Sequence, residues 1–157
     1  MKRLFPLLLL LLCAALSACS SMQRTISVWY VVGDPEARET IRAEAIAVPD
    51  GETPLDTALH ALFTPPEDAT LSLSLPTGTA LRSTELEDGL LTLDLSAPYG
   101  ELAGMALTLA DACIVLTLTE LPEVEAVRIT VNGAPLSSRG EQVLSAENFL
   151  SVFSADD

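Results

Sequence analysis

The chain has 157 residues and is strongly acidic, with 22 Asp or Glu against eight Lys or Arg and a formal net charge of −14. An acidic surface repels phosphate groups, so nucleic acid is excluded as a partner, whereas a basic protein or a cationic ligand would be attracted. A net charge of this size is also explained by solubility alone, and that is the interpretation we favour.

The N-terminus has the pattern of an export signal. Lys2 and Arg3 precede an apolar stretch, Leu7–Leu12, that is too short for a stable transmembrane span. The sequence Leu16-Ser17-Ala18-Cys19 then resembles the lipobox of bacterial lipoproteins. The resemblance implies a signal peptide at 1–18, a lipid on the Cys19 thiol and attachment to the extracytoplasmic face of the cell membrane. The alternative is an ordinary secretion signal that ends in cysteine.

Cleavage at this position would leave a single domain of ordinary size, preceded by a lipidated N-terminus and leash at 19–25. Six Arg would then stand against 22 acids, a net charge of −16. Cys13 would leave with the signal and Cys19 would carry lipid, so no internal disulfide is expected. Cys113 remains, and its apolar neighbours favour a buried, inert thiol.

Two strands and a helix are predicted for the first half of the domain. Alternation of apolar and other residues predicts strands over 26–32 and 39–48, joined by a turn at 33–36. Thr53 offers an N-cap directly before Pro54, so a helix should begin at Pro54. The Pro65-Pro66 pair should stop this helix.

The clearest hairpin in the sequence follows. After a short extended piece at 71–75, the predicted strands 79–87 and 90–95 flank Asp88-Gly89. This pair suits the positive backbone φ angles of a two-residue turn.

A long helix is predicted over 101–121. It is apolar almost all round, which indicates a mostly buried helix with Asp111 on a narrow solvated edge. A strand over 127–131 follows, closed by the Asn132-Gly133 turn and a hairpin back through 142–144. The tail at 145–157 has enough apolar residues for one short helical turn.

The element order is therefore β-β-α-β-β-α-β, with an extra hairpin at the end. This order predicts an α+β fold over residues 26–144. A single mixed sheet with two helices packed on one face is the economical way to cover the alternating strands.

Residues 75–133 carry a series of landmarks in order. They are Leu75-Pro76-Thr77-Gly78-Thr79, Asp88-Gly89, Leu93-Asp94-Leu95-Ser96, the helix end at 116–122 and the closing strand at 124–133. Together they resemble the GerMN domain of sporulation and spore-germination lipoproteins. The resemblance implies a fold similar to the ring-building motifs of export-apparatus and sporulation-channel proteins. It also implies a scaffold or assembly role outside the cytoplasmic membrane, without catalysis.

Residues that could carry catalysis or bind a metal are scarce. His60 is the only histidine, and it lacks the partners that a zinc site or a catalytic triad requires. Asp88 and Asp94 resemble the carboxylate pair of a glycosidase only in residue type. Asp88 belongs to a turn, and Asp94 is placed to accept backbone N–H groups. We therefore expect no catalytic residue, no metal ligand and no cofactor.

Trp29 is the residue that we expect to contact a partner. It points to the opposite face of the first strand from Val28 and Tyr30, and would lie on an open sheet surface if the helices cover the other face. The alternative is that it covers a sheet edge or packs beneath a loop. The leading hypothesis is a non-enzymatic lipoprotein that binds another envelope protein or copies of itself. The second is a cell-wall polymer-binding module or an envelope hydrolase that uses acidic residues.

Overall fold

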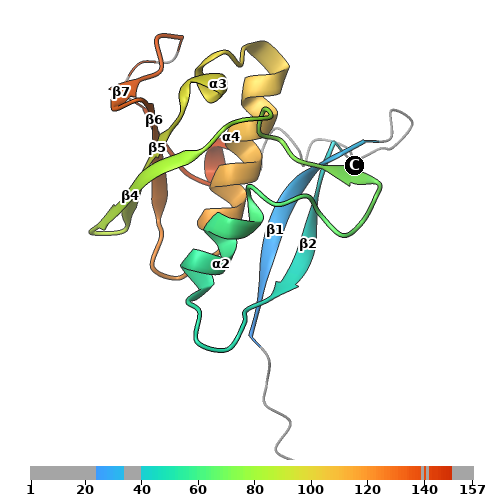
Figure 1. The fold of residues 1–157 in the computed structure, drawn as a ribbon. Helices are drawn as coiled ribbons and strands as arrows, with labels where there is room; N and C mark the ends of the chain where they lie inside the picture. The colour runs from blue at the N-terminus through green and yellow to red at the C-terminus, as the bar shows by residue number, and fades with distance from the viewer. Residues whose placement is uncertain (1–23, 34–39, 139, 141, 150–157) are drawn as a thin grey trace, which may run out of the picture.

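Two sheets lie on either side of a central helix in the computed structural model, which describes residues 24–33, 40–138, 140 and 142–149 (Figure 1). The first sheet has the order β2 (Ile41–Ala47), β1 (Thr25–Val32), β3 (Leu71–Ser72). The second has the order β4 (Leu81–Glu87), β5 (Leu90–Leu95), β6 (Ala126–Val131), β7 (Ala134–Pro135), with β8 (Val143–Leu144) also paired to β6. The α+β class is confirmed, and the prediction of a single sheet is wrong.

The first sheet contains both strands predicted near the start of the domain. β1 and β2 pair antiparallel, from Thr25 opposite Ala47 to Val31 opposite Ile41. β3 adds two residues on the other side of β1, so the piece predicted at 71–75 is a strand only at its start. Of the predicted turn at 33–36, only Gly33 lies within the described residues.

Capping sets the start of helix α2 (Pro54–Ala61), as predicted. The Thr53 hydroxyl oxygen accepts the backbone N–H of Asp56 at 3.1 Å, and Pro54 occupies the first helical position. Leu59 and its apolar neighbours pack into the core. The helix ends before the Pro65-Pro66 pair, which cannot continue it.

The second sheet is built around the predicted hairpin. β4 and β5 pair antiparallel across Asp88 and Gly89, whose φ angles of 48° and 81° are positive, as the two-residue turn requires. β5 and β6 run parallel because the chain crosses over through helices before it returns. Asn132 and Gly133 also have positive φ angles and lead into β7, while β8 forms the predicted return strand.

The long helix predicted over 101–121 is shorter in the structure, because it begins at Gly104 and ends at Leu118. A short helix, α3 (Ala97–Gly100), comes first, and α4 (Gly104–Leu118) begins after a break. Ala103 is extended and Gly104 has a φ of +57°. A left-handed residue cannot continue a right-handed helix, so these two positions separate α3 from α4.

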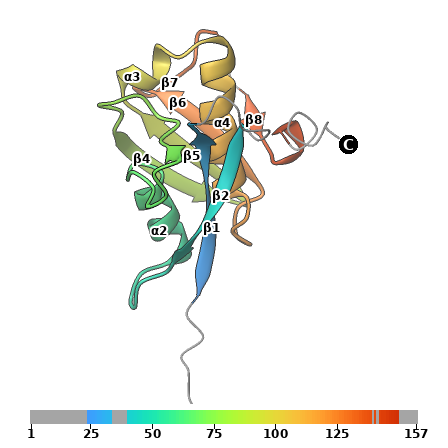
Figure 2. The same ribbon diagram turned by 90° about the vertical axis from the view of Figure 1, so that its right-hand side faces the viewer.

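Helix α4 lies between the two sheets (Figures 1 and 2). It contacts both β1 and β6, and every residue from Ala110 to Leu118 is buried. The core also includes Val28 and Tyr30 of β1 and three leucines of β5. A helix that is apolar all round needs cover on every side, and one sheet can cover only one side. The two-sheet arrangement supplies that cover.

The polar and apolar positions of α4 differ from the predicted ones. Asp111 was expected on a solvated edge, but it is buried and accepts a hydrogen bond from the hydroxyl of Tyr99 in α3. Burial is tolerated because the carboxylate has this partner. The exposed part is instead the first turn, where Met105 keeps 68% of its surface exposed.

The start of the tail also folds onto the domain. The Ser145 N–H donates to Asn148 Oδ1 at 2.7 Å, which caps a helical turn, and Phe149 is buried in the core. Residues 150–157, which include the other apolar residues of the predicted turn, lie outside the described part of the chain.

Candidate functional site

Trp29 lies in the middle of β1 and is half-buried. Its backbone N–H donates to the hydroxyl of Thr117 in α4 at 2.9 Å, and its indole Nε1–H donates to Glu120 Oε1 at 3.2 Å. The side chain also packs against the core. Trp29 is therefore fixed by Thr117 at the end of α4 and by Glu120 just after it, while the residue stays partly exposed. Cys19, the other predicted site residue, lies outside the described residues.

On the outer face of the first sheet, small side chains lie on one side of Trp29, and Val31 and Ile41 lie on the other. Direct cross-strand partners share a face, and the register places Trp29 opposite Ala43 and Ser27 opposite Ala45. Ala43, Ala45 and Ala47 are all exposed. β2 ends the strand order of this sheet, so its outer backbone edge has no strand partner among the described residues. We call Ser27, Trp29, Ala43, Ala45 and Ala47 the Trp29 face.

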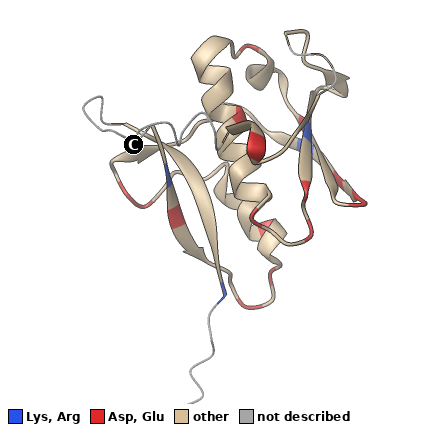
Figure 3. Ribbon diagram, turned by 180° about the vertical axis from the view of Figure 1, so that it is seen from behind, with Lys and Arg blue, Asp and Glu red and all other residues tan. Residues whose placement is uncertain are grey.

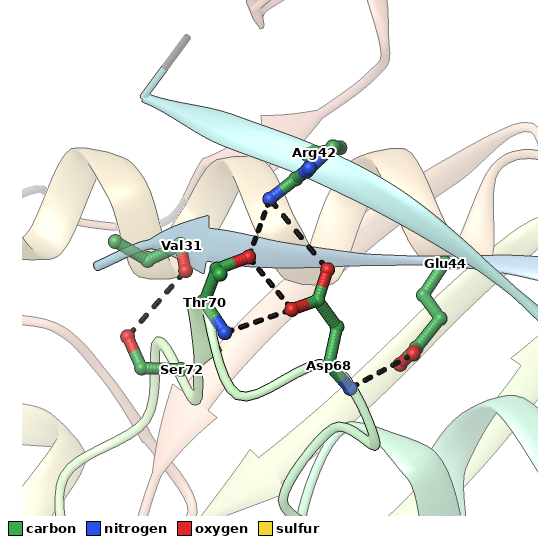
Figure 4. A network of polar contacts seen from close by, with 6 residues as sticks. All are labelled: Val31, Arg42, Glu44, Asp68, Thr70 and Ser72. Carbon is green, nitrogen blue, oxygen red and sulfur yellow. Dashed lines mark hydrogen bonds and ion pairs between the residues drawn. The ribbon is translucent and has the colours of Figure 1, made fainter. Parts of the chain in front are cut away.

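On the other face of β2, a polar network attaches the segment that follows α2 (Figure 4). Arg42 Nη2 donates to Thr70 Oγ1 at 2.8 Å and lies 3.8 Å from Asp68 Oδ2. Asp68 Oδ1 accepts the hydroxyl and the backbone N–H of Thr70, and these two bonds lower the pKa of Asp68. The Asp68 N–H in turn donates to Glu44 Oε1 at 3.2 Å.

A cavity of about 600 Å³ opens between β2, α2 and the segment 64–67. We call it the β2–α2 cavity. It is lined by Tyr30, Glu44, Ala45, Ile46, Ala47, Pro49, Glu52, Thr57, His60, Ala61, Thr64, Pro65, Pro66 and Glu67. Tyr30, Thr57 and Ala61 are buried and form its deep part.

Tyr30 donates its hydroxyl to the Ala61 carbonyl at 3.3 Å. Burial, with a smaller contribution from the charge of Glu44, raises the pKa of Tyr30 to about 12. Tyr30 therefore stays protonated and neutral at physiological pH, and the deep part of the cavity presents no phenolate.

The other acids considered as catalytic candidates have structural partners. Asp94 Oδ1 accepts the Gly133 N–H at 2.7 Å and the Thr130 hydroxyl at 2.9 Å, while Oδ2 accepts Arg82 Nε at 3.0 Å. The Gly133 N–H is the largest cause of the lowered pKa of Asp94. Asp94 does accept a backbone N–H, as predicted, but from the turn after β6. Asp88 occupies the hairpin turn.

His60 and Cys113 have opposite surroundings, one exposed and the other buried. His60 is exposed on α2, with Thr64 Oγ1 3.4 Å from its Nε2. Cys113 is fully buried as predicted, and burial raises the pKa of its thiol to about 12. Within residues 24–33, 40–138, 140 and 142–149, no three His, Cys, Asp or Glu side chains cluster as metal ligands. No helix in this part of the chain has the length and apolarity to span a membrane.

Sequence reasoning did not find the β2–α2 cavity. Alternation in β2 predicted a strand, but it did not predict that the alanines would be the exposed side or that Glu44 would face a cavity beside α2. The contacts of Asp68 with β2 cross 24 or more residues, and no local pattern signals them.

Comparisons with known proteins agree on one domain type. Residues 28–137 match the family described as Germane, sporulation and spore germination. The first GerMN domain of the sporulation protein GerM from Bacillus subtilis superposes with a TM-score of 0.61 at 17% identity, covering 78% of this chain and 95% of that one. The tandem GerMN domains of the same protein give a TM-score of 0.58 at 24% identity, covering 78% and 44%. No curated protein shows a significant sequence match.

Proposed function

Because the chain belongs to the Germane family of sporulation and spore germination, we propose that it is a lipid-anchored envelope protein whose GerMN domain is a non-catalytic scaffold for a partner protein. The signal at 1–18 and Cys19 support the anchor. The Trp29 face is the observation that carries the scaffold role. The family description, sporulation and spore germination, supports a role in one of these two processes.

The Trp29 face has the features of a protein contact. An unpaired strand edge can accept a strand from another chain, and among the described residues β2 offers such an edge beside exposed alanines. Tryptophan is enriched among the residues that contribute most to binding. Trp29 is already fixed by Thr117 and Glu120, so little conformational entropy would be lost when a partner covers it.

The partner that we propose is an envelope protein with a basic surface. After signal cleavage the chain carries six Arg against 22 acids. The acids of the described residues lie mainly on strands, loops and the hairpin end, and the central helix is almost uncharged (Figure 3). A second copy would bring the same negative charge and be repelled, whereas a basic surface would be attracted.

The hydrogen bonds of Asp94 within the domain favour a scaffold role over a hydrolase that would use this carboxylate for catalysis. Both of its carboxylate oxygens hold other parts of the domain, the turn after β6 and Arg82. A carboxylate that transfers protons to a sugar must be accessible to it.

The test is a pull-down from solubilised membranes with the lipidated protein as bait. Trp29→Ala and Ala43→Arg should each reduce recovery of the bound protein by about 10-fold or more, because truncating a central aromatic residue typically weakens binding by about 2 kcal/mol. Ser83→Arg, the same charge change on the exposed strand β4, is the control. Ala43 is exposed, so its variant separates binding from folding.

Three results would contradict this proposal. Equal recovery by all variants would place the contact elsewhere. Sedimentation of the bait with purified cell-wall polymer, with no protein recovered, would favour the polymer-binding alternative. Concentration-dependent dimers of the bait that Ala43→Arg abolishes would identify a second copy as the occupant.

A further inference from the structure

The β2–α2 cavity has the size and the fixed walls of a small-molecule site. Its volume of about 600 Å³ falls within the range of about 300 to 1,000 Å³ that is usual for such sites. One wall, the segment 64–67, is continuous with the Arg42, Asp68 and Thr70 network (Figure 4). That network holds this wall against β2 through contacts within the chain itself.

Part of the lining is apolar. Ile46 comes from β2, Ala61 from α2, and Pro65 and Pro66 from the segment after α2. Together with the protonated Tyr30, these side chains suit an aliphatic or otherwise apolar stem. Proline rings also keep this wall stiff, because their φ angles are fixed.

The charged part of the lining has one sign. Glu44, Glu52 and Glu67 line the cavity, and none of the described residues that line it is Lys or Arg. Arg42 is the neighbouring cation on the same face of β2, but its guanidinium is engaged by Thr70 and Asp68. The cavity therefore has a negative potential that repels anions and attracts cations.

Glu44 is incompletely satisfied. Its Oε1 accepts the Asp68 N–H, but its Oε2 is buried and has no hydrogen-bond partner. A buried carboxylate oxygen without a donor is unfavourable, and a nearby positive charge compensates it. Glu52 is held at the mouth of the cavity, where Thr57 donates its hydroxyl to Glu52 Oε2 at 3.2 Å.

We infer that the β2–α2 cavity binds a small organic cation, an ammonium or guanidinium group on a short apolar stem. The cationic group lies toward Glu44 and Glu52, and the stem lies against Ile46 and the two prolines. This inference goes beyond the scaffold role and requires no partner protein. The β2 side chains that it uses, Glu44 and Ile46, alternate with the alanines of the Trp29 face. Ala45 and Ala47 border both the cavity and that face, whereas Ala43 borders the face alone.

The test uses the ¹⁵N-labelled lipidated protein in a neutral detergent and pentylammonium chloride as the probe. Amide signals of β2, α2 and 64–67 should shift and saturate, with a dissociation constant of about 1 mM for a ligand of this size. Pentanol and sodium pentanoate, which have the same stem without the positive charge, should bind at least about fivefold more weakly.

Variants that remove one glutamate charge each test whether the pentylammonium ion binds in the β2–α2 cavity. Glu44→Gln and Glu52→Gln should each raise the dissociation constant about fivefold, the size expected for one partly screened charge pair. Glu87→Gln, at the end of β4 in the other sheet, is the matched control and should leave it unchanged. Glu52 is exposed, so its variant should fold even if Glu44→Gln does not.

Two results would overturn the inference. One is the absence of saturating shifts up to about 50 mM amine, well above the expected range. The other is shifts that pentanol reproduces with the same affinity, or that both glutamine variants leave unchanged. Ala43→Arg should bind the amine as the wild type does, so failure of the scaffold proposal and failure of this one are distinguishable.

Discussion

Two truncations on α4, Ile114→Ala and Leu116→Ala, test whether the helix is covered on both sides. Residues two apart on an α-helix point about 200° away from each other, so one sheet cannot cover both. Both side chains are nevertheless buried, with 1% of Ile114 and 5% of Leu116 exposed. The two-sheet fold therefore predicts that both truncations destabilise the domain substantially.

The expected loss is about 2 to 4 kcal/mol for each variant. Burying one such side chain contributes about 1.5 to 3 kcal/mol, and the cavity left after truncation adds to the loss. Met105→Ala is the matched control on the same helix. Because 68% of Met105 is exposed, its truncation should cost less than about 1 kcal/mol.

Urea unfolding of residues 20–157 measures these free energies, with fluorescence of Trp29, the only tryptophan of the chain, as the signal. Changes in the midpoint at a constant slope report stability alone. A loss above about 2 kcal/mol for Ile114→Ala with a loss below about 1 kcal/mol for Leu116→Ala would refute the reasoning, since one side of α4 would then be uncovered.

Two further predictions concern Asp94 and Cys19. The Gly133 N–H lowers the pKa of Asp94, so its contribution to stability is present above about pH 4, the unfolded value, and is lost as the pH falls through the folded pKa. The urea midpoint of the wild type should therefore fall more steeply on acidification than that of Asp94→Asn, and parallel curves would contradict this role. Cys19→Ala should remove the lipid and move the protein from the membrane to the soluble fraction, or leave an uncleaved precursor. Unchanged mass and fractionation would count against the anchor.

The turns and the cap of helix α2 could be predicted from the sequence because they depend on residues that are adjacent in the chain. Asp88-Gly89 and Asn132-Gly133 tolerate positive φ angles, and each forms the predicted turn. Thr53 and Pro54 start α2 because a hydroxyl can accept a free N–H one turn ahead. The family resemblance also rested on such landmarks in order.

The assignment of strands to sheets could not be predicted in the same way. Alternation indicates that one face of a strand is buried, but not which element buries it. The sequence showed that α4 is apolar on all sides. The structure gives the reason, because β1 and β6 contact the helix from two different sheets. The burial of Asp111 could not be predicted for the same reason, since its partner Tyr99 lies in a separate short helix, α3, that the sequence analysis did not predict.

The sequence by itself determined most of the strands, the start of α2, the turns at Asp88-Gly89 and Asn132-Gly133, the burial of Cys113 and the domain family, because these depend on short-range pattern and composition. Only the tertiary structure decided that two sheets enclose α4, that Trp29 is fixed by Thr117 and Glu120, and that Glu44 lines a cavity beside α2. These features depend on contacts between segments distant in sequence, whose geometry is set by packing of the whole core.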